Sequence, residues 1–310
     1  MFRLAHVTDP HFRPDSNPFE GSKPADFVGK RSLGMMNLLI RRRHSHRMEL
    51  LAALVDELRS RPADHLAVTG DLGNVALVSE WAAARRWLDR VGMDGAAVTV
   101  IPGNHDAYVA EVVTAGTFES TFAAYQTAEL RAGDHHYPFV RVRGDVALIG
   151  VNSCVATGDF GAWGQIGADQ LARLEGLLTS PALAGKTRVV LIHHPPVLQK
   201  GAENRNLRDR AALVALLART GAELVLHGHD HRDERAQLPG PGGRSIPVIG
   251  AGSASYAGAP EKRSRYNVYE IEGGGTAAVT YAHDEASNRF IEVRRELIET
   301  AAPGKSGAHS

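Results

Sequence analysis

The chain has 310 residues, 43% of them hydrophobic, and its 35 lysines and arginines balance 35 aspartates and glutamates. This balance gives no global sign of a nucleic-acid binder or an acidic tail. No apolar run approaches the ~20 residues of a transmembrane helix and the start lacks a signal-peptide pattern, so we expect a cytoplasmic protein. The single cysteine, Cys154, excludes an intrachain disulfide framework and a cysteine-based zinc site, and we predict a buried thiol.

Predicted strands alternate with predicted helices along most of the chain. Hydrophobic periodicity predicts helices at residues 48–59, 79–91, 117–130, 168–178 and 208–220, the last ended by Gly221. Apolar or alternating runs predict strands at residues 4–7, 66–69, 98–101, 137–143, 146–152, 189–192, 224–226, 246–249, 266–271, 277–282 and 290–294. We therefore predict one α/β (α+β) domain over residues 1–300, with two packed mixed β-sheets and helices outside, and a disordered tail over residues 301–310.

Five short segments place metal-binding side chains directly after apolar, β-branched runs. They are Asp-Pro-His at 9–11, Gly-Asp-Leu-Gly-Asn at 70–74, Gly-Asn-His-Asp at 103–106, His-His-Pro-Pro at 193–196 and His-Gly-His-Asp-His at 227–231. Side chains at such positions lie in loops at strand ends, where open α/β sheets place their active sites. Each segment alone is common in turns and loops. All five in this order predict a metal site.

The order and spacing of these segments resemble the calcineurin-like metallophosphoesterases over roughly residues 1–255. Within that superfamily they look most like the bacterial class III phosphodiesterases, which include cyclic-nucleotide and glycerophosphodiester hydrolases. The resemblance implies a four-layer αββα sandwich with a dinuclear metal site. It also implies that Asp71 bridges two ions, one held by Asp9, His11 and His231 and the other by Asn104, His193 and His229.

The residue types suit phosphodiester hydrolysis. Two metal ions about 3.5–4 Å apart supply a nucleophile at neutral pH and positive charge for the phosphoryl oxygens, so that a bridging hydroxide attacks phosphorus directly. Carboxylate, imidazole and amide ligands without thiolate suit manganese, iron, cobalt, nickel or zinc. The resemblance further implies that His105, beside Asn104, contacts the substrate or protonates its leaving oxygen, and that Asp106 helps to orient His105.

We expect the remaining polar residues of the motifs, and the histidines outside them, to have structural roles. We expect Asn74 to support the loop that carries Asp71, and His194 and His227 to be supporting or structural residues rather than ligands. The other histidines match no motif and are expected in the core or on the surface: His6, His44, His46, His65, His135, His136 and His283.

Residues 23–47 form a basic and apolar insert between the first two metal-binding segments. Its basic residues are Lys23, Lys30, Arg31, Arg41, Arg42, Arg43 and Arg47, against the single acid Asp26. This combination is typical of a surface element that meets anionic lipid. The alternative is a helix whose apolar face packs on the sheet while its arginines stay solvated, and such a helix can still form one wall of the substrate cleft.

Three functions follow as hypotheses. The first is a phosphodiesterase that acts on a small diester such as a cyclic nucleotide or a glycerophosphodiester. The second is a pyrophosphohydrolase of a nucleotide-linked lipid of the UDP-diacylglucosamine type, bound peripherally to the membrane through residues 23–47. The third is a non-catalytic metal-binding scaffold, against which the complete ligand set argues. The strand-rich stretch after Tyr266 is a candidate surface for forming a homo-oligomer.

Overall fold

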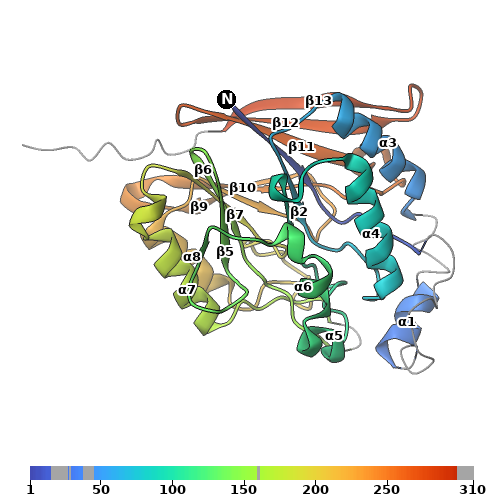
Figure 1. Ribbon diagram of the computed structural model, residues 1–310, viewed down its shortest axis with the longest axis horizontal. Helices are drawn as coiled ribbons and strands as arrows, with labels where there is room; N and C mark the ends of the chain where they lie inside the picture. The colour runs from blue at the N-terminus through green and yellow to red at the C-terminus, as the bar shows by residue number, and fades with distance from the viewer. Residues whose placement is uncertain (15–26, 28, 38–44, 159–160, 299–310) are drawn as a thin grey trace, which may run out of the picture.

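The computed structural model describes residues 1–14, 27, 29–37, 45–158 and 161–298. Within these ranges two β-sheets pack face to face, and helices cover the outer face of each sheet (Figure 1). The predicted four-layer sandwich of two mixed sheets is therefore confirmed. The predicted disordered tail at residues 301–310 lies outside the described residues.

The first sheet has six strands and the second has seven. In spatial order the first contains β13 (Arg289–Ile298), β12 (Gly275–Asp284), β11 (Arg265–Glu272), β1 (Phe2–Val7), β2 (His65–Thr69) and β3 (Val98–Ile101). The second contains β4 (Leu130–Arg131), β5 (Phe139–Arg143), β6 (Val146–Gly150), β7 (Thr187–Leu191), β8 (Leu224–His227), β10 (Ser245–Gly250) and β9 (Glu234–Pro239). The strands β1, β2 and β3 run parallel, as do β6, β7, β8 and β10. The carboxyl ends of each parallel group therefore meet at one edge of its sheet.

Helices α3 (Met48–Ser60) and α4 (Val78–Val91) cover the first sheet, and α7 (Ala168–Leu178) and α8 (Arg210–Thr220) cover the second (Figure 1). Helix α8 ends at Gly221 as predicted. The shorter helices are α1 (Lys30–Asn37), α5 (Ala110–Ala115) and α6 (Thr117–Thr121). Short 3-10 turns occupy Gly95–Ala97, Ala123–Tyr125, Pro181–Leu183, Pro241–Gly243 and Pro260–Lys262.

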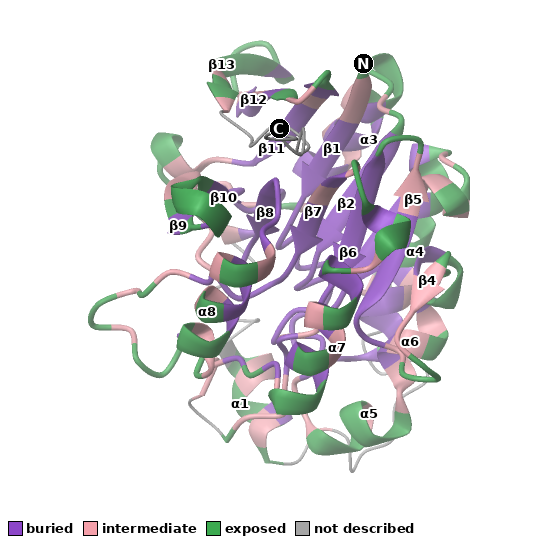
Figure 2. Ribbon diagram, turned by 90° about the vertical axis from the view of Figure 1, so that its left-hand side faces the viewer, coloured by how far each residue is buried: buried purple, intermediate pink, exposed green. Residues whose placement is uncertain are grey.

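Three apolar clusters fill the interfaces between the four layers. In β2, Leu66 and Val68 pack toward α3 and α4, whereas Ala67 between them packs toward the second sheet. In β8, Val225 packs toward α7 and α8, whereas its neighbours pack between the sheets. Because these central strands are buried on both faces, they consist of continuous apolar runs, which made them recognisable in the sequence. Figure 2 shows these buried strands between the exposed outer faces of the helices.

The prediction of a helix over residues 117–130 is wrong beyond Thr121, where helix α6 ends. There the chain bends through the 3-10 turn Ala123–Tyr125 and pairs with β5 as the short strand β4. Phe118, Phe122 and Tyr125 have the sequence spacing of a helix because all three pack into the same core cluster. The turn is tied to β3 by Gln126, whose side-chain amide donates to the carbonyl of Val100 at 2.9 Å.

Only part of the basic insert lies within the described residues, and Lys23 and the arginines at 41–43 lie outside them. In α1, Arg31 is buried and donates to the carbonyl oxygens of Val75 and Ala76 at 3.1 and 2.9 Å, so it joins the insert to the loop after β2. Leu33 and Met36 on the same helix are exposed. None of the described helices is long and apolar enough to cross a membrane.

Candidate metal centre

The five predicted metal-binding segments follow β1, β2, β3, β7 and β8 at their carboxyl ends, and hydrogen bonds of backbone and side chains join them to one another. In the first sheet, the Asp9 amide donates to the Gly70 carbonyl and the His11 amide to the Asp71 carbonyl, both at 3.0 Å. In the second sheet, the Gly228 amide donates to the His193 carbonyl at 3.1 Å. Across the sheets, the His193 ring lies 2.8 Å from the carbonyl oxygen of Thr69. The site therefore sits where the strand ends of both sheets meet.

Two glycines, Gly70 before Asp71 and Gly103 before Asn104, permit this close packing. A Cβ atom on Gly70, whose φ is 93°, would lie 2.5 Å from the backbone nitrogen of Gly103. A Cβ atom on Gly103 would lie 2.1 Å from both the backbone nitrogen and Oδ1 of Asp71. Such distances are sterically impossible, so both positions require a residue without a side chain.

Left-handed backbone conformations are concentrated in the same loops. Among the described residues, seven that are not glycine have positive φ, and five of these seven are expected ligands. The five are Asp9, His11, Asp71, His229 and His231, with φ between 49° and 75°. Each such conformation costs of order 1–3 kcal/mol and persists only where the surrounding structure enforces it. Their clustering indicates that the loops are built to direct these side chains.

In three of the expected histidine ligands, one ring nitrogen lies within hydrogen-bonding distance of a backbone carbonyl oxygen. These contacts join His11 Nδ1 to Gly73 at 3.1 Å, His193 Nδ1 to Thr69 at 2.8 Å and His229 Nε2 to Arg205 at 3.1 Å. The opposite nitrogens point inward: His11 Nε2 lies 3.1 Å from His231 Nε2, and both His193 Nε2 and His229 Nδ1 lie within 3.1 Å of the Asn104 amide oxygen. This is the arrangement of metal-binding imidazoles, whose second nitrogen donates to a fixed acceptor.

The Asp71 carboxylate lies between the two groups of histidines. Its Oδ1 is 3.4 Å from His193 Nε2, and its Oδ2 is 3.8 Å from His11 Nε2. The second carboxylate, Asp9, has Oδ1 3.1 Å from His231 Nε2. Asp9, His11, Asp71 and His231 each offer a ligand atom within 4.8 Å of the others. Asp71 therefore occupies the place that a bridging ligand requires.

The electrostatics of the cluster favour bound cations. Burial, followed by the negative charge of Asp9, holds the pKa of Asp71 well above its usual range. Burial also opposes ionisation of Asp9, but the charges of His231 and His193 and the hydrogen bonds from His231 and Thr8 together outweigh it, so the pKa of Asp9 is lowered. Two buried carboxylates this close are unfavourable together, and a divalent cation removes both the repulsion and the cost of burying charge. Together with the carboxylate, imidazole and amide donors, this fits a pair of divalent metal ions.

The hydrogen bonds of Asp106 differ from the sequence-based prediction. Its buried carboxylate accepts from the backbone amides of Leu72, Gly73 and Gly103 and from the indole of Trp81, at 2.9–3.0 Å. Nδ1 of His105 instead donates to the carbonyl oxygen of Asn74 at 2.5 Å. Asp106 therefore joins the loops after β2 and β3. The Asn74 carbonyl, rather than Asp106, makes the hydrogen bond that orients His105.

Asn74, His194 and His227 have structural contacts. The Asn74 side chain donates to the Phe12 carbonyl at 2.8 Å, which joins the loop of Asp71 to that of His11. Both ring nitrogens of His194 have partners, the Ser153 hydroxyl at 2.8 Å and the Ala162 carbonyl at 3.1 Å. Nδ1 of His227 lies 3.0 Å from the Gly228 carbonyl, and burial lowers the pKa of His227 to about 4. Buried Cys154 is the thiol predicted from the sequence.

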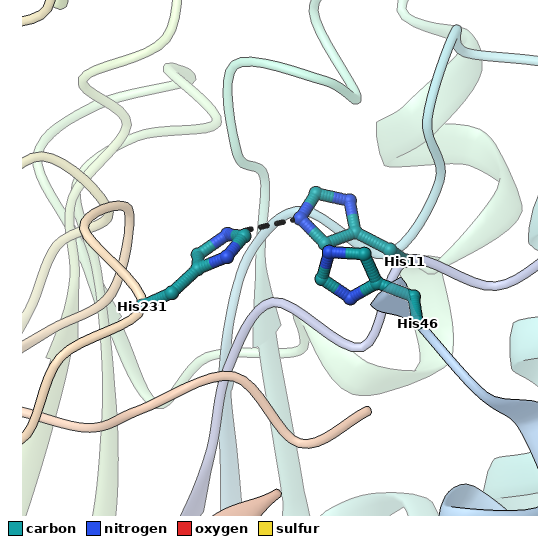
Figure 3. A group of neighbouring side chains, drawn as sticks. All are labelled: His11, His46 and His231. Atoms are coloured by element: carbon teal, nitrogen blue, oxygen red, sulfur yellow. Dashed lines mark hydrogen bonds between the residues drawn. The ribbon is translucent and has the colours of Figure 1, made fainter. Parts of the chain in front are cut away.

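His46 is the residue that the sequence did not reveal. It belongs to the basic insert, matches no metal-binding motif and was expected in the core or on the surface. In the fold it is buried beside His11 and His231, and each of the three histidines offers a nitrogen within 4.8 Å of the others (Figure 3). No local signal distinguishes His46 from the neighbouring His44, because its position depends on contacts with residues far along the chain.

A cleft of about 490 Å³ opens over Asp71, Asn104 and His105. Four basic side chains line it together with two tyrosines: Lys30, Arg205, Arg232, Lys262, Tyr108 and Tyr256. The Tyr108 ring stacks on His105 with a centroid distance of 5.8 Å, and the Lys30 ammonium lies 4.3 Å from the centre of the same ring. Because Lys30 belongs to the insert, the insert contributes a basic side chain to the lining of the cleft.

A family model described as "Calcineurin-like phosphoesterase" matches residues 2–233. The chain belongs to this family. The enzyme is therefore a metal-dependent phosphoester hydrolase, and its family uses a dinuclear divalent metal centre. A search of curated proteins found no significant match.

Solved structures confirm the fold. A dimetal phosphatase from Danio rerio is 14% identical, with a TM-score of 0.61 over 97% of this chain and 99% of the other. A purple acid phosphatase from yellow lupin (Lupinus luteus) is 12% identical, with a TM-score of 0.57 over 96% of this chain and 53% of the other. At these identities the likeness concerns the fold alone.

Proposed function

We propose that this enzyme hydrolyses a small phosphodiester at a dinuclear metal centre. The observation that carries the proposal is the position of Asp71 between two groups of histidines at the base of the cleft. Asp9, His11 and His231 would hold one ion, Asn104, His193 and His229 the other, and Asp71 both. When bound, the ions supply positive charge for the phosphoryl oxygens and a nucleophile at neutral pH.

His105 would act on the substrate rather than on the metal. Its Nδ1 proton is held by the Asn74 carbonyl, so Nε2 is the nitrogen directed at the site, 4.0 Å from Asp71 Oδ2. In its protonated form Nε2 donates to a phosphoryl oxygen or to the leaving oxygen. The stacked Tyr108 restricts rotation of the ring and lines the same cleft.

The cleft supports a small anionic diester as the substrate class. Its volume lies within the usual range of ligand sites, and its basic side chains neutralise an anionic group beyond the metal centre. Tyr256 offers a flat apolar surface to a base or another planar group. A cyclic nucleotide or a glycerophosphodiester meets these requirements, and the five motifs resemble those of class III phosphodiesterases.

Paired chromogenic substrates test the proposal. The metal-loaded enzyme is assayed on bis(p-nitrophenyl) phosphate and on p-nitrophenyl phosphate with manganese present, followed by a panel of cyclic nucleotides and glycerophosphodiesters. We expect a higher kcat/KM for the diester than for the monoester. Equal or faster turnover of the monoester would overturn the diesterase assignment and leave a phosphatase.

One observation favours a second candidate, the pyrophosphohydrolase of a nucleotide-linked lipid. Leu33 and Met36 are 42% and 55% exposed on α1, the helix that also carries Lys30 into the cleft. An exposed apolar pair beside a basic cleft suits an acyl chain next to a diphosphate. Vesicle flotation tests it: substitution of both residues by serine should abolish binding to anionic vesicles, whereas Val293→Ser on β13 should not. An unsubstituted protein that does not float would exclude this candidate.

A further inference from the structure

Residues far apart in the chain hold His46 in place. The segment at residues 45–47 pairs with residues 255–257: the Arg47 amide donates to the Ser255 carbonyl at 2.9 Å, and the Ala257 amide to the Ser45 carbonyl at 2.8 Å. His46 and Tyr256 form the antiparallel bridge between these two hydrogen bonds. His46 is only 5% exposed. The insert therefore returns to the fold at the metal centre.

The ring of His46 approaches the expected ligands as closely as they approach one another. Its centroid lies 4.7 Å from that of His11 and 5.4 Å from that of His231. The corresponding distance between His11 and His231 is 5.0 Å, and between His193 and His229 it is 5.2 Å. Figure 3 shows the three rings of His11, His46 and His231 converging.

A fixed hydrogen bond orients the ring of His46. Its Nδ1 lies 2.8 Å from the hydroxyl oxygen of Ser255, a side chain that is itself fully buried. Ligating histidines are held by contacts of this kind, which set the ring orientation and the tautomer. His194 differs, because both of its ring nitrogens have protein partners, the Ser153 hydroxyl and the Ala162 carbonyl.

We propose that His46 is a further imidazole ligand of the ion held by Asp9, His11 and His231. This inference rests on the ligand assignment of the proposed function and goes beyond it, because none of the five motifs contains His46. His11 and His231 belong both to the group of three histidines and to the group that contains Asp9 and Asp71, and within each group the ligand atoms lie within 4.8 Å of one another. A third imidazole makes this ion site richer in nitrogen than the other. It therefore favours cobalt, nickel, zinc or iron over manganese there.

Cobalt(II) binding tests this role independently of catalysis. Metal-free full-length protein is titrated with cobalt(II) against a chromogenic chelator, and the visible absorption spectrum is recorded at each step. His46→Ala should weaken binding of one of the two ions by at least about 10–100-fold. The same substitution should change the absorption bands of that ion. His135→Ala, which removes an exposed imidazole, should leave both unchanged.

Two further variants separate a ligand from a structural residue. Ser255→Ala removes only the orienting hydroxyl, and we expect a smaller loss of affinity in the same ion site. His46→Gln keeps a group that can hydrogen-bond Ser255 but removes the imidazole, so it decides the question if His46→Ala lowers the thermal stability of the metal-free protein. We expect His46→Gln to melt like the unsubstituted metal-free protein and to lose the cobalt bands of that site.

The experiment distinguishes failure of the proposed function from failure of the role proposed for His46. If the unsubstituted protein binds fewer than two cobalt ions, the dinuclear assignment and the proposed function fall together. If it binds two, and the folded His46 variants retain the affinity and spectrum of His135→Ala, only the role of His46 is overturned.

Discussion

His105 Nδ1 lies 2.5 Å from the carbonyl oxygen of Asn74. Because a carbonyl oxygen can only accept, the Nδ1 proton is held there and Nε2 is directed toward Asp71. The Gly-Asp-Leu-Gly-Asn loop thus supplies both the expected bridging carboxylate and the contact that orients the expected acid. A displacement of this loop would affect both together.

Substitution of His105 by alanine should remove catalysis without removing metal. Its ring is an expected substrate contact, so both ions should remain bound while kcat falls roughly 10²–10⁴-fold, the range for general acid catalysis. Metal content and steady-state kinetics measure the two effects. If His105 protonates the leaving oxygen, the loss should be larger for an alkyl diester than for a p-nitrophenyl diester. Activity within a few-fold of the original would refute the role.

Asp71→Asn should prevent binding of the metal pair. An amide lacks the charge that offsets two cations and bridges them poorly, so we expect one ion or none per chain instead of two. Elemental analysis after dialysis against manganese gives the ratio directly. Asp284→Asn, at the half-buried carboxyl end of β12, should keep the original content. Two ions in the Asp71 variant would show that this carboxylate is not the bridge.

Gly103→Ala should damage the site through steric contact alone. The added Cβ would meet the backbone nitrogen and Oδ1 of Asp71 at 2.1 Å, so the loops after β2 and β3 must separate. We expect lower thermal stability and weaker metal binding. Gly176→Ala is the matched control, because its Cβ meets nothing within 4 Å in helix α7 and should stabilise the helix by about 0.5–1 kcal/mol. Equal behaviour of the two variants would contradict the packing argument.

Asp106→Asn should act on stability and metal binding together. The carboxylate accepts from three backbone amides and the Trp81 indole, and hydrogen bonds to charged groups contribute about 1.5–3 kcal/mol each. An asparagine replaces one oxygen by a donor and loses part of this network. We expect a lower melting temperature and weaker metal affinity. A loss of kcat alone, with stability and metal content intact, would instead support a direct contact with His105.

His65 should make the metal-free protein sensitive to acid. Burial, followed by the charges of Arg141 and Arg143, lowers its pKa from 6.5 to about 3. The unfolded chain therefore takes up a proton between these values when the folded protein does not, and stability present above pH 6.5 is lost as pH falls toward 3.

For each pH unit by which the pH falls within that window, His65 should lower the free energy of unfolding by up to about 1.4 kcal/mol. His65→Gln, which can still hydrogen-bond Thr99, should make the fall of unfolding free energy between pH 6.5 and 4 shallower by that amount. Urea denaturation with a chelator present measures it, and exposed His135→Gln serves as control. Parallel curves for His65→Gln and the control would show that His65 is not the source.

Local sequence patterns were sufficient to predict the layers of the fold and to select the residues expected to bind metal. The central strands are buried on both faces, so each is an apolar run, and the residues that follow parallel strands necessarily meet at one edge of a sheet. The helix predicted at residues 117–130 failed because the spacing of Phe118, Phe122 and Tyr125 is the same in a helix and in a bent segment whose rings share one cluster. Periodicity reports burial and does not report the path of the backbone.

The sequence by itself determined the five strand-end segments and, with them, the donor types and the reaction class, because each segment is local and follows its own strand. Only the tertiary structure decided that Asn74 orients His105, that Lys30 lines the cleft and that His46 joins His11 and His231. These contacts link residues far apart along the chain; the hydrogen bond between His46 and Ser255 spans 209 positions. Such a contact depends on how separate segments pack, and packing at that distance leaves no pattern in the residues nearby.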